Sequence, residues 1–287
     1  METKITDTSN TINQGGRAER YWRGKSVKSR SSSPLRAAAD VDLQKILQKY
    51  NLKGFEFGNW MNNNERYDRV LACEDSLERL AHVIGSKNLG IEGLVGIAFG
   101  ARGSGKALAH YEPDHNMINI TKVTGDGCLA HEYGHALDYN LGRYVDLNKR
   151  YNYLSGGRTV VANLEDNKGG NLRNQMNEVI NEASVMLNVR LNKYLDEKFK
   201  NQKARERMKA TFIYWRQRNE IFARLFEQYI CFQLKDKKQL VGFLTPLWSY
   251  YTESNTALFY WTESEFNKLL PKMNKLVKEV KKTLNSK

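Results

Sequence analysis

Two histidines and a glutamate in "GCLAHEYGHALDYN", residues 127–140, are the side chains whose types and spacing best suit chemistry. His131 and His135 are four residues apart, so on an α-helix they project from the same face, one turn from each other. Two imidazoles in this position can bind one Zn²⁺ at roughly 2.0–2.1 Å. Glu132 is adjacent, where its carboxylate can reach a water molecule in an open coordination position. The stretch therefore predicts a helical zinc site.

The order His-Glu-x-x-His is typical of zinc metallopeptidases, which hydrolyse peptide bonds with a metal-activated water molecule. In that chemistry Glu132 is the catalytic base, which accepts a proton from the water and then donates it to the leaving amine. The alternative is an ordinary buried helix whose histidines are satisfied by other core groups. The small neighbours Ala130 and Ala136 favour the metal site, because burying two histidines and a glutamate without a shared partner is costly.

Two histidines and a water molecule leave one position for a ligand from another part of the chain. The segment "NEIFARLFEQYI", residues 219–230, predicts an amphipathic helix with glutamates along one face. We select Glu220 as the third metal ligand, because the small side chain of Ala223, one turn later, leaves room for the ion. Glu227 and Glu182 are the alternatives, and any of these glutamates could instead lie on a solvated or salt-bridged helix face.

Three further side chains are candidates for supporting roles at this site. Asp138 lies three residues after His135 and could orient an imidazole through a hydrogen bond. His110 and Tyr133 could donate hydrogen bonds to the oxyanion of a tetrahedral intermediate. The competing interpretation of His110 is a structural or exposed histidine on a strand.

The segments before the histidine helix predict its supporting elements. Residues 39–52 and 72–85 have apolar side chains at helical spacing, with Asp40 or Asp42 as a cap for the first and Gly85 as the end of the second. Residues 93–103, 107–113 and 116–123 are rich in apolar and β-branched residues and predict three strands, which we expect to be antiparallel.

Turn chemistry separates these strands. Gly103–Gly105 and Pro113–Asn116 predict hairpin connections. Asp126 is expected to cap the histidine helix, which should run from about Cys128 to Tyr139.

The stretch "GARGSGK", residues 100–106, nearly matches a phosphate-binding loop, but Ala107 stands where a hydroxyl should bind Mg²⁺. The residues after it predict a strand instead of the helix that such a loop requires. We therefore expect no nucleotide or other organic cofactor. A strand at the edge of the sheet, "AFGARG" or "ALAHYEP", could instead pair with an extended peptide substrate.

The stretch "GIAFGARGSGKALAHYEPDHNMINITKVTGDGCLAHEYGHALD", residues 96–138, resembles the large polyvalent-protein-associated domain of the first type. This is a zincin-like family encoded by phages, conjugative elements and other mobile DNA. Residues 57–85 and 219–230 are also similar to the family, and the likeness spans roughly residues 40–235. The resemblance implies a zincin core, a Zn²⁺ site at His131 and His135 and a catalytic base at Glu132, and it matches Glu220 to the family's downstream acidic position.

The predicted fold is therefore α+β. A zincin-like metallopeptidase domain would span residues 36–245, with a small antiparallel or mixed sheet packed on the histidine helix and a helical insert at about 145–210. Residues 1–35 predict a disordered arm, because residues 17–36 hold seven basic side chains, one acidic side chain and few large apolar ones. Residues 246–287 predict an aromatic and lysine-rich helical extension.

Composition bounds the partners and the compartment. The formal net charge is +13 and the sequence pI is about 9.5, which favours contact with polyanions, so the basic arm is a candidate for binding nucleic acid. Three sparse cysteines and the lack of an early apolar run or a membrane-length apolar segment predict a cytoplasmic protein without a membrane partner. The sequence thus predicts a zinc metallopeptidase of a phage or mobile element, acting on a protein or peptide. The alternative is a non-proteolytic, zinc-binding protein associated with nucleic acid.

Overall fold

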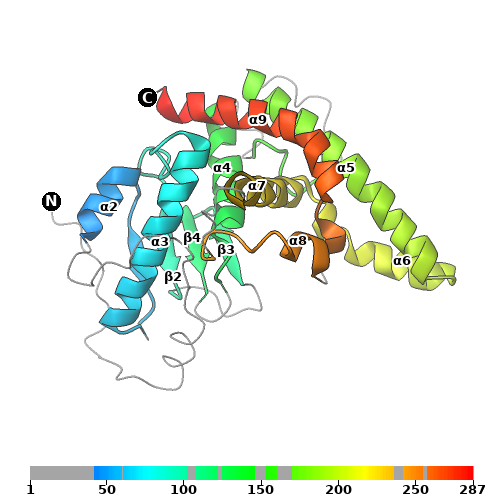
Figure 1. Cartoon of the computed structure of the whole chain (residues 1–287), viewed down its shortest axis with the longest axis horizontal. Coiled ribbons are helices and arrows are strands. Elements are labelled where there is room, and N and C mark those ends of the chain that lie inside the picture. The colour runs from blue at the N-terminus through cyan, green and yellow to red at the C-terminus, as the bar shows by residue number, and fades with distance from the viewer. Residues whose placement is uncertain are drawn as a thin grey trace. The chain divides into compact units, whose positions relative to one another are not determined.

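The computed structural model describes residues 42–59, 61–101, 108–121, 125–145, 153–160, 170–235, 242–254 and 257–286. These residues form a mixture of helices and one small sheet (Figure 1), which confirms the α+β class. The predicted basic arm, residues 1–35, lies outside the described residues.

Contacts between residues divide the chain into two compact units. The first contains the chain up to Ala136, the segment Ile230–Leu247 and the residues from Thr283 onward, and the second contains Leu137–Tyr229 and Trp248–Lys282. Helices α4 (Leu129–Val145) and α7 (Arg218–Lys235) each contribute residues to both units. The predicted boundaries at residues 36, 245 and 246 stay predictions.

The sheet of the first unit has four strands in the order β1 (Phe55–Phe57), β2 (Gly96–Phe99), β4 (Met117–Ile120) and β3 (Ala109–Glu112). The pairs β1–β2 and β2–β4 are parallel, whereas β3–β4 is antiparallel. All residues of β2 and β4 are buried, as is typical of the inner strands of a parallel arrangement.

The structure confirms the three predicted strands but corrects their arrangement. The sheet is mixed and not wholly antiparallel, and β2 does not form a hairpin with β3, because β4 lies between them. Side-chain alternation cannot distinguish parallel from antiparallel pairing, and β1 is too short to give a periodic signal. The predicted turn at Pro113–Asn116 is confirmed: the Asn116 amide donates to the Pro113 carbonyl at 3.2 Å, and Asn116 has a φ of 52°.

Two helices precede the inner strands. Helix α2 (Leu43–Tyr50) is capped by Asp42, whose carboxylate accepts from the Lys45 amide at 3.1 Å, as predicted. Helix α3 (Asn63–Ile84) starts with a reciprocal capping pair between Asn62 and Glu65. It ends at Gly85, as predicted, and Gly85 has a left-handed conformation with a φ of 77°.

The start of α4 differs from the prediction. The helix begins at Leu129, so Asp126 is not its cap, and the Asp126 carboxylate instead forms an ion pair with Arg69 of α3. Backbone carbonyls take over part of the capping role: the Ala130 amide donates to the Leu244 carbonyl at 3.0 Å. The helix also continues beyond the predicted end at Tyr139, to Val145.

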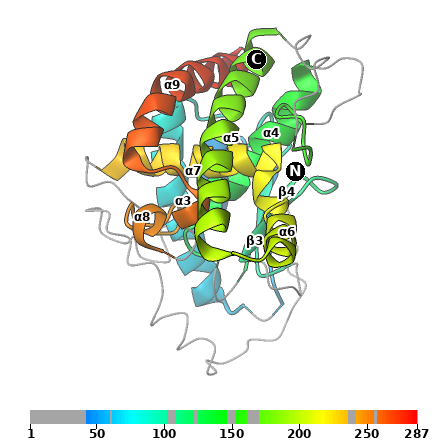
Figure 2. The ribbon, with the colours of Figure 1, turned by 90° about the vertical axis from the view of Figure 1, so that its right-hand side faces the viewer.

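The described part of the second unit is helical. Helices α5 (Gly170–Lys198) and α9 (Glu263–Asn285), both visible in Figure 2, are joined by ion pairs from Lys272 to Glu182 and from Arg190 to Glu265. The remaining elements are α6 (Gln202–Thr211), η3 (Tyr214–Arg216), α8 (Tyr250–Glu253) and η4 (Ala257–Phe259). No described helix has the length and apolar character that crossing a membrane requires.

The ion pair between Arg69 and Asp126 generates a stability prediction. The Arg69 side chain is only 4% exposed, and burial lowers its pKa to about 10. We expect Asp126→Ala to lower the free energy of unfolding by about 3 kcal/mol, because the guanidinium would stay buried without this carboxylate. Urea denaturation measures the loss. Lys282→Ala, which removes a solvent-exposed pair with Glu279, is the control and should cost less than about 1 kcal/mol. Equal losses in the two variants would contradict the prediction.

Candidate metal centre

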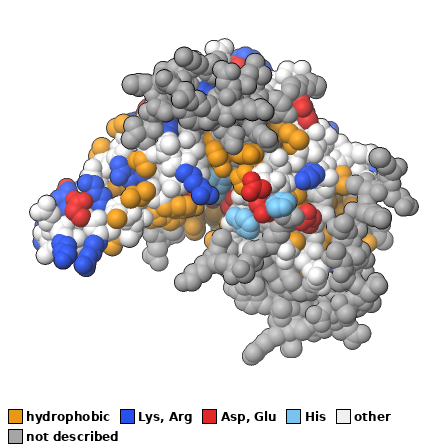
Figure 3. Space-filling model, turned by 180° about the vertical axis from the view of Figure 1, so that it is seen from behind, with side chains coloured by type: hydrophobic (Ala, Val, Ile, Leu, Met, Phe, Trp, Pro, Cys, Tyr) orange, Lys and Arg blue, Asp and Glu red, His pale blue; other side chains and the backbone are white. Residues whose placement is uncertain are grey.

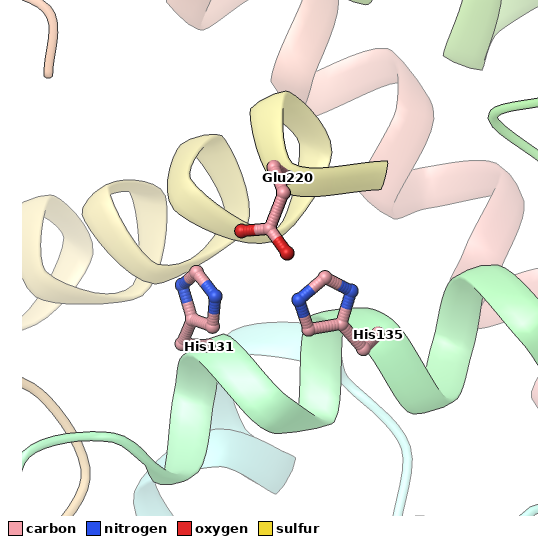
Figure 4. Close-up of side chains that lie close together, drawn as sticks. All are labelled: His131, His135 and Glu220. Carbon is pink, nitrogen blue, oxygen red and sulfur yellow. The ribbon is translucent and has the colours of Figure 1, made fainter. Parts of the chain in front are cut away.

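His131, His135 and Glu220 come together in the folded chain. Each offers one ligand atom, and these atoms all lie within 4.8 Å of one another. Figure 4 shows both imidazole rings rising from α4 toward the carboxylate of Glu220, which comes from the first turn of α7. In the described part of the chain this is the group of histidine, cysteine and acidic side chains with the geometry to hold a metal ion.

Helix α4 positions the two histidines by its regular geometry. They are separated by one turn, and their ring centroids are 5.0 Å apart with an angle of 76° between the ring planes. His135 is 9% exposed and His131 is half-buried. The neighbouring side chains of Ala130 and Ala136 are fully buried, so α4 is held in the core while its histidine face remains available to a ligand.

Glu220 is a buried carboxylate, with 5% of its surface exposed. Arg224, one turn later on α7, is fully buried, and its Nε donates to the Glu220 backbone carbonyl at 3.1 Å. The other guanidinium nitrogens of Arg224 donate to the backbone carbonyls of Trp215 and Phe259. Burial lowers the pKa of Arg224, whereas the nearby Glu220 and Glu227 oppose that change.

The structure separates Glu220 from its two alternatives. Glu227 is buried, but its carboxylate accepts hydrogen bonds from the hydroxyl groups of Tyr251 and Tyr260, both at 3.2 Å. Glu182 pairs with Lys272 on α9. Neither belongs to the group with metal-binding geometry.

Glu132 follows His131 in the first turn of α4 and is 7% exposed. Its backbone amide donates to the Cys128 carbonyl at 3.1 Å, which places it within the regular part of the helix. Its catalytic role stays a prediction.

The supporting candidates lie in three different settings. Both carboxylate oxygens of Asp138 accept hydrogen bonds at 2.6 Å from Ser155, so Asp138 anchors a loop, and its contact with an imidazole stays a prediction. Tyr133 is 1% exposed, and its position two residues from each histidine directs it to the opposite side of α4; burial raises its pKa. His110 is on β3, opposite Asn119 of β4. The oxyanion roles of Tyr133 and His110 stay predictions.

Two polar residues beside the site were not predicted. Ser155 contacts Asp138, and Arg218 is the first residue of α7, two positions before Glu220. No sequence motif marks either residue. Arg218 and Ser155 contact each other across segments that are far apart in the sequence, and such contacts leave no local pattern.

Two imidazoles and one carboxylate form a donor set that could hold a metal ion. Histidine and acidic side chains lie next to each other on the face seen in Figure 3, and the half-exposed His131 gives the group contact with solvent. No protein-family model matches this chain, and no curated protein or solved structure matches it either. The function is accordingly inferred from the residues and their geometry.

We expect Glu220→Gln to weaken Zn²⁺ binding by about ten- to a hundredfold, because a neutral amide replaces the only carboxylate of the group. Competition with a chromogenic chelator measures the affinity. Glu227→Gln is the matched control, since it makes the same chemical change two turns later on α7 and should leave the affinity unchanged. A larger loss in Glu227→Gln than in Glu220→Gln would reverse the ligand assignment.

Proposed function

We propose that this protein is a zinc-dependent metallopeptidase with a zincin-like core. The single observation that carries the proposal is the convergence of His131, His135 and Glu220, with Glu132 next to the first histidine. A metal site built for structure alone is typically closed by four protein ligands, whereas the described residues supply three here. An open position and an adjacent carboxylate are the requirements of metal-assisted hydrolysis.

The donor set fits zinc better than the other common divalent ions. Imidazole nitrogens suit zinc, whereas magnesium and calcium prefer oxygen ligands throughout. Zinc binds nitrogen and carboxylate oxygen at roughly 2.0–2.2 Å, so ligand atoms within 4.8 Å of one another need only small side-chain movements to share one ion. A divalent cation would also balance the negative charge of the buried Glu220.

When bound, zinc would activate a water molecule by lowering its pKa and would polarise the carbonyl group of the substrate. Glu132 would accept a proton from the attacking water through its carboxylate. As the peptide bond breaks, the same group would donate that proton to the leaving amine nitrogen. Glu220, His131 and His135 would hold the metal throughout, from helices α4 and α7.

An extended substrate would pair with strand β3. Among the described strands β3 lies at one edge of the sheet, and its hydrogen bonds to β4 use only one of its two sides. The alternative edge strand "AFGARG" is wrong for Ala98 and Phe99, because these residues lie in β2, which pairs with β1 on one side and β4 on the other. His110 is on β3, where it could contact a peptide paired with that edge.

The resemblance of residues 96–138 to a family of mobile genetic elements leads us to propose a phage or mobile-element origin and a protein substrate. The cytoplasm is the proposed compartment, and Cys73, Cys128 and Cys231 are all free thiols, as a reducing compartment would leave them.

We expect Glu132→Gln to reduce peptide hydrolysis by at least about a hundredfold while leaving bound zinc unchanged, because the variant loses the proton acceptor and keeps the ligands. Mass spectrometry of new protein termini, together with elemental analysis, measures both quantities. Glu263→Gln is the control, since Glu263 is also a glutamate in the first turn of a helix and lies outside the site. Undiminished cleavage by a zinc-loaded Glu132→Gln variant would remove Glu132 from the mechanism.

A second candidate function is binding of nucleic acid, and helix α6 favours it. This helix has no buried residue, and Lys200, Lys203 and Arg207 are exposed on it and just before it. Lys203 and Arg207 are one turn apart and therefore share a face. Such a row of cations could contact phosphates.

We expect reversal of these three charges, Lys200→Glu, Lys203→Glu and Arg207→Glu together, to weaken binding of duplex DNA and to flatten its dependence on salt. Fluorescence anisotropy over a series of salt concentrations measures both. Reversal of the exposed Lys275, Lys278 and Lys281 on α9 changes the net charge equally and serves as the control. Equal effects of the two triple variants would show that only net charge matters, and no effect of the α6 variant would exclude this surface.

A further inference from the structure

A short loop, residues 153–160, is attached to the helix that carries the histidines. The Ser155 amide and hydroxyl both donate to the Asp138 carboxylate at 2.6 Å, and the Leu154 amide donates to the Asp138 carbonyl at 2.8 Å. Asp138 and Ser155 are fully buried. Because Asp138 follows His135 by three residues on α4, the loop is fixed directly beside the metal-binding turn.

The same loop holds the beginning of α7. The first amides of a helix have no partner within the helix, and here the loop supplies the acceptors. The Arg218 amide donates to the Thr159 carbonyl at 2.9 Å, and the Asn219 amide donates to the Gly157 carbonyl at 3.1 Å. The side chain of Arg218 adds a third bond, from Nε to the Ser155 carbonyl at 2.6 Å.

Arg218 also fixes this junction to α5. Its two terminal nitrogens donate to the side-chain oxygens of Asn181 and Asn177, each at 2.7 Å. The Arg218 side chain is 2% exposed. Its planar guanidinium therefore donates, within the core, to three neutral oxygens: one in the 153–160 loop and two on α5. A lysine at this position would keep the charge but could not reproduce bonds in three fixed directions.

We propose that Arg218 is a positioning residue for the third metal ligand, acting through the 153–160 loop and Asp138. Glu220 lies two residues after Arg218, in a helical turn that would fray without outside acceptors. The bonds of Arg218 and Ser155 fix that turn relative to the part of α4 that follows His135. The inference rests on the proposed metal site and adds that Glu220 is held in place before the ion arrives, which lowers the entropy lost on binding.

The test compares Arg218→Lys with the wild-type protein in its affinity for Zn²⁺, measured by competition with a chromogenic chelator. We expect about a ten- to hundredfold loss of affinity, the range found when groups that orient metal ligands are removed. The visible spectrum of the Co²⁺-loaded protein should change as well, because it reports the coordination geometry. Arg190→Lys is the matched control: Arg190 is also in the second unit and bonds Glu265, but it does not contact the loop.

A double-mutant cycle distinguishes positioning from general stabilisation. If Arg218 acts through Glu220, then Arg218→Lys should have little further effect on zinc affinity in a Glu220→Gln background. In the metal-free protein, the amides of the first turn of α7 should exchange hydrogen faster in Arg218→Lys than in Arg190→Lys. Ser155→Ala removes the hydroxyl bond to Asp138 and the bond that the hydroxyl accepts from the Gly157 amide, but leaves the bond from the Ser155 amide to Asp138. It should reproduce the affinity loss in weaker form, and it replaces Arg218→Lys in the test if that variant does not fold.

Unchanged zinc affinity in a folded Arg218→Lys or Ser155→Ala variant would overturn the positioning role and leave the proposed metallopeptidase intact. Additive losses in the cycle would do the same. If the wild-type protein itself binds no zinc, the proposed function fails and the positioning role fails with it.

Discussion

The burial of one carboxylate beside two imidazoles is the constraint on which the site depends. Glu220 is 5% exposed and lies within 4.8 Å of ligand atoms of His131 and His135. Removing an ionised carboxylate from water is costly unless an opposite charge compensates it, and the fully buried guanidinium of Arg224 is one cation near Glu220. Under the proposed function, a divalent cation would add to this compensation. Helices α4 and α7 supply its three ligands.

Helix α7 carries this electrostatic arrangement further along its length. Arg224 follows Glu220 by four residues and precedes Glu227 by three, so the three charges lie near one face of the helix. Glu227 is satisfied by the hydroxyls of Tyr251 and Tyr260, and the guanidinium of Arg224 is surrounded by the rings of Trp215, Tyr260 and Trp261. The aromatic segment after residue 246 is therefore mostly core: Tyr251, Tyr260 and Trp261 are at most 6% exposed. Two of its tyrosines bond Glu227, which lies outside the group with metal-binding geometry.

Local regularities made much of this fold predictable. The spacing of His131 and His135 fixes their shared face, and the Asp42 cap, the Gly85 helix end and the Pro113–Asn116 turn follow from the conformational preferences of single residues. The failures concern partners that are remote in the sequence. Asp126 had the side chain of a helix cap, but a stronger interaction with Arg69, 57 residues earlier, competes for it. Strand periodicity identifies β2, β3 and β4 but contains no information on which strand lies next to which. The small side chain of Ala223, one turn later, indicates Glu220 as the metal ligand. Ser155 and Arg218 have no such local signal, because their contacts form only when three segments of the chain meet.

The paths of α4, α7 and α9 through the fold have a consequence for biosynthesis. The end of α9 bonds back to the first unit, where Asn88 donates to the Leu284 carbonyl and Asn285 donates to the Gly85 carbonyl, across 196 and 200 residues. At translation speeds of about 5–20 residues per second, the histidines leave the ribosome several seconds before Glu220 and longer still before those contacts can form. A nascent chain thus holds an incomplete donor set until Glu220 has emerged and α7 has formed beside the two histidines.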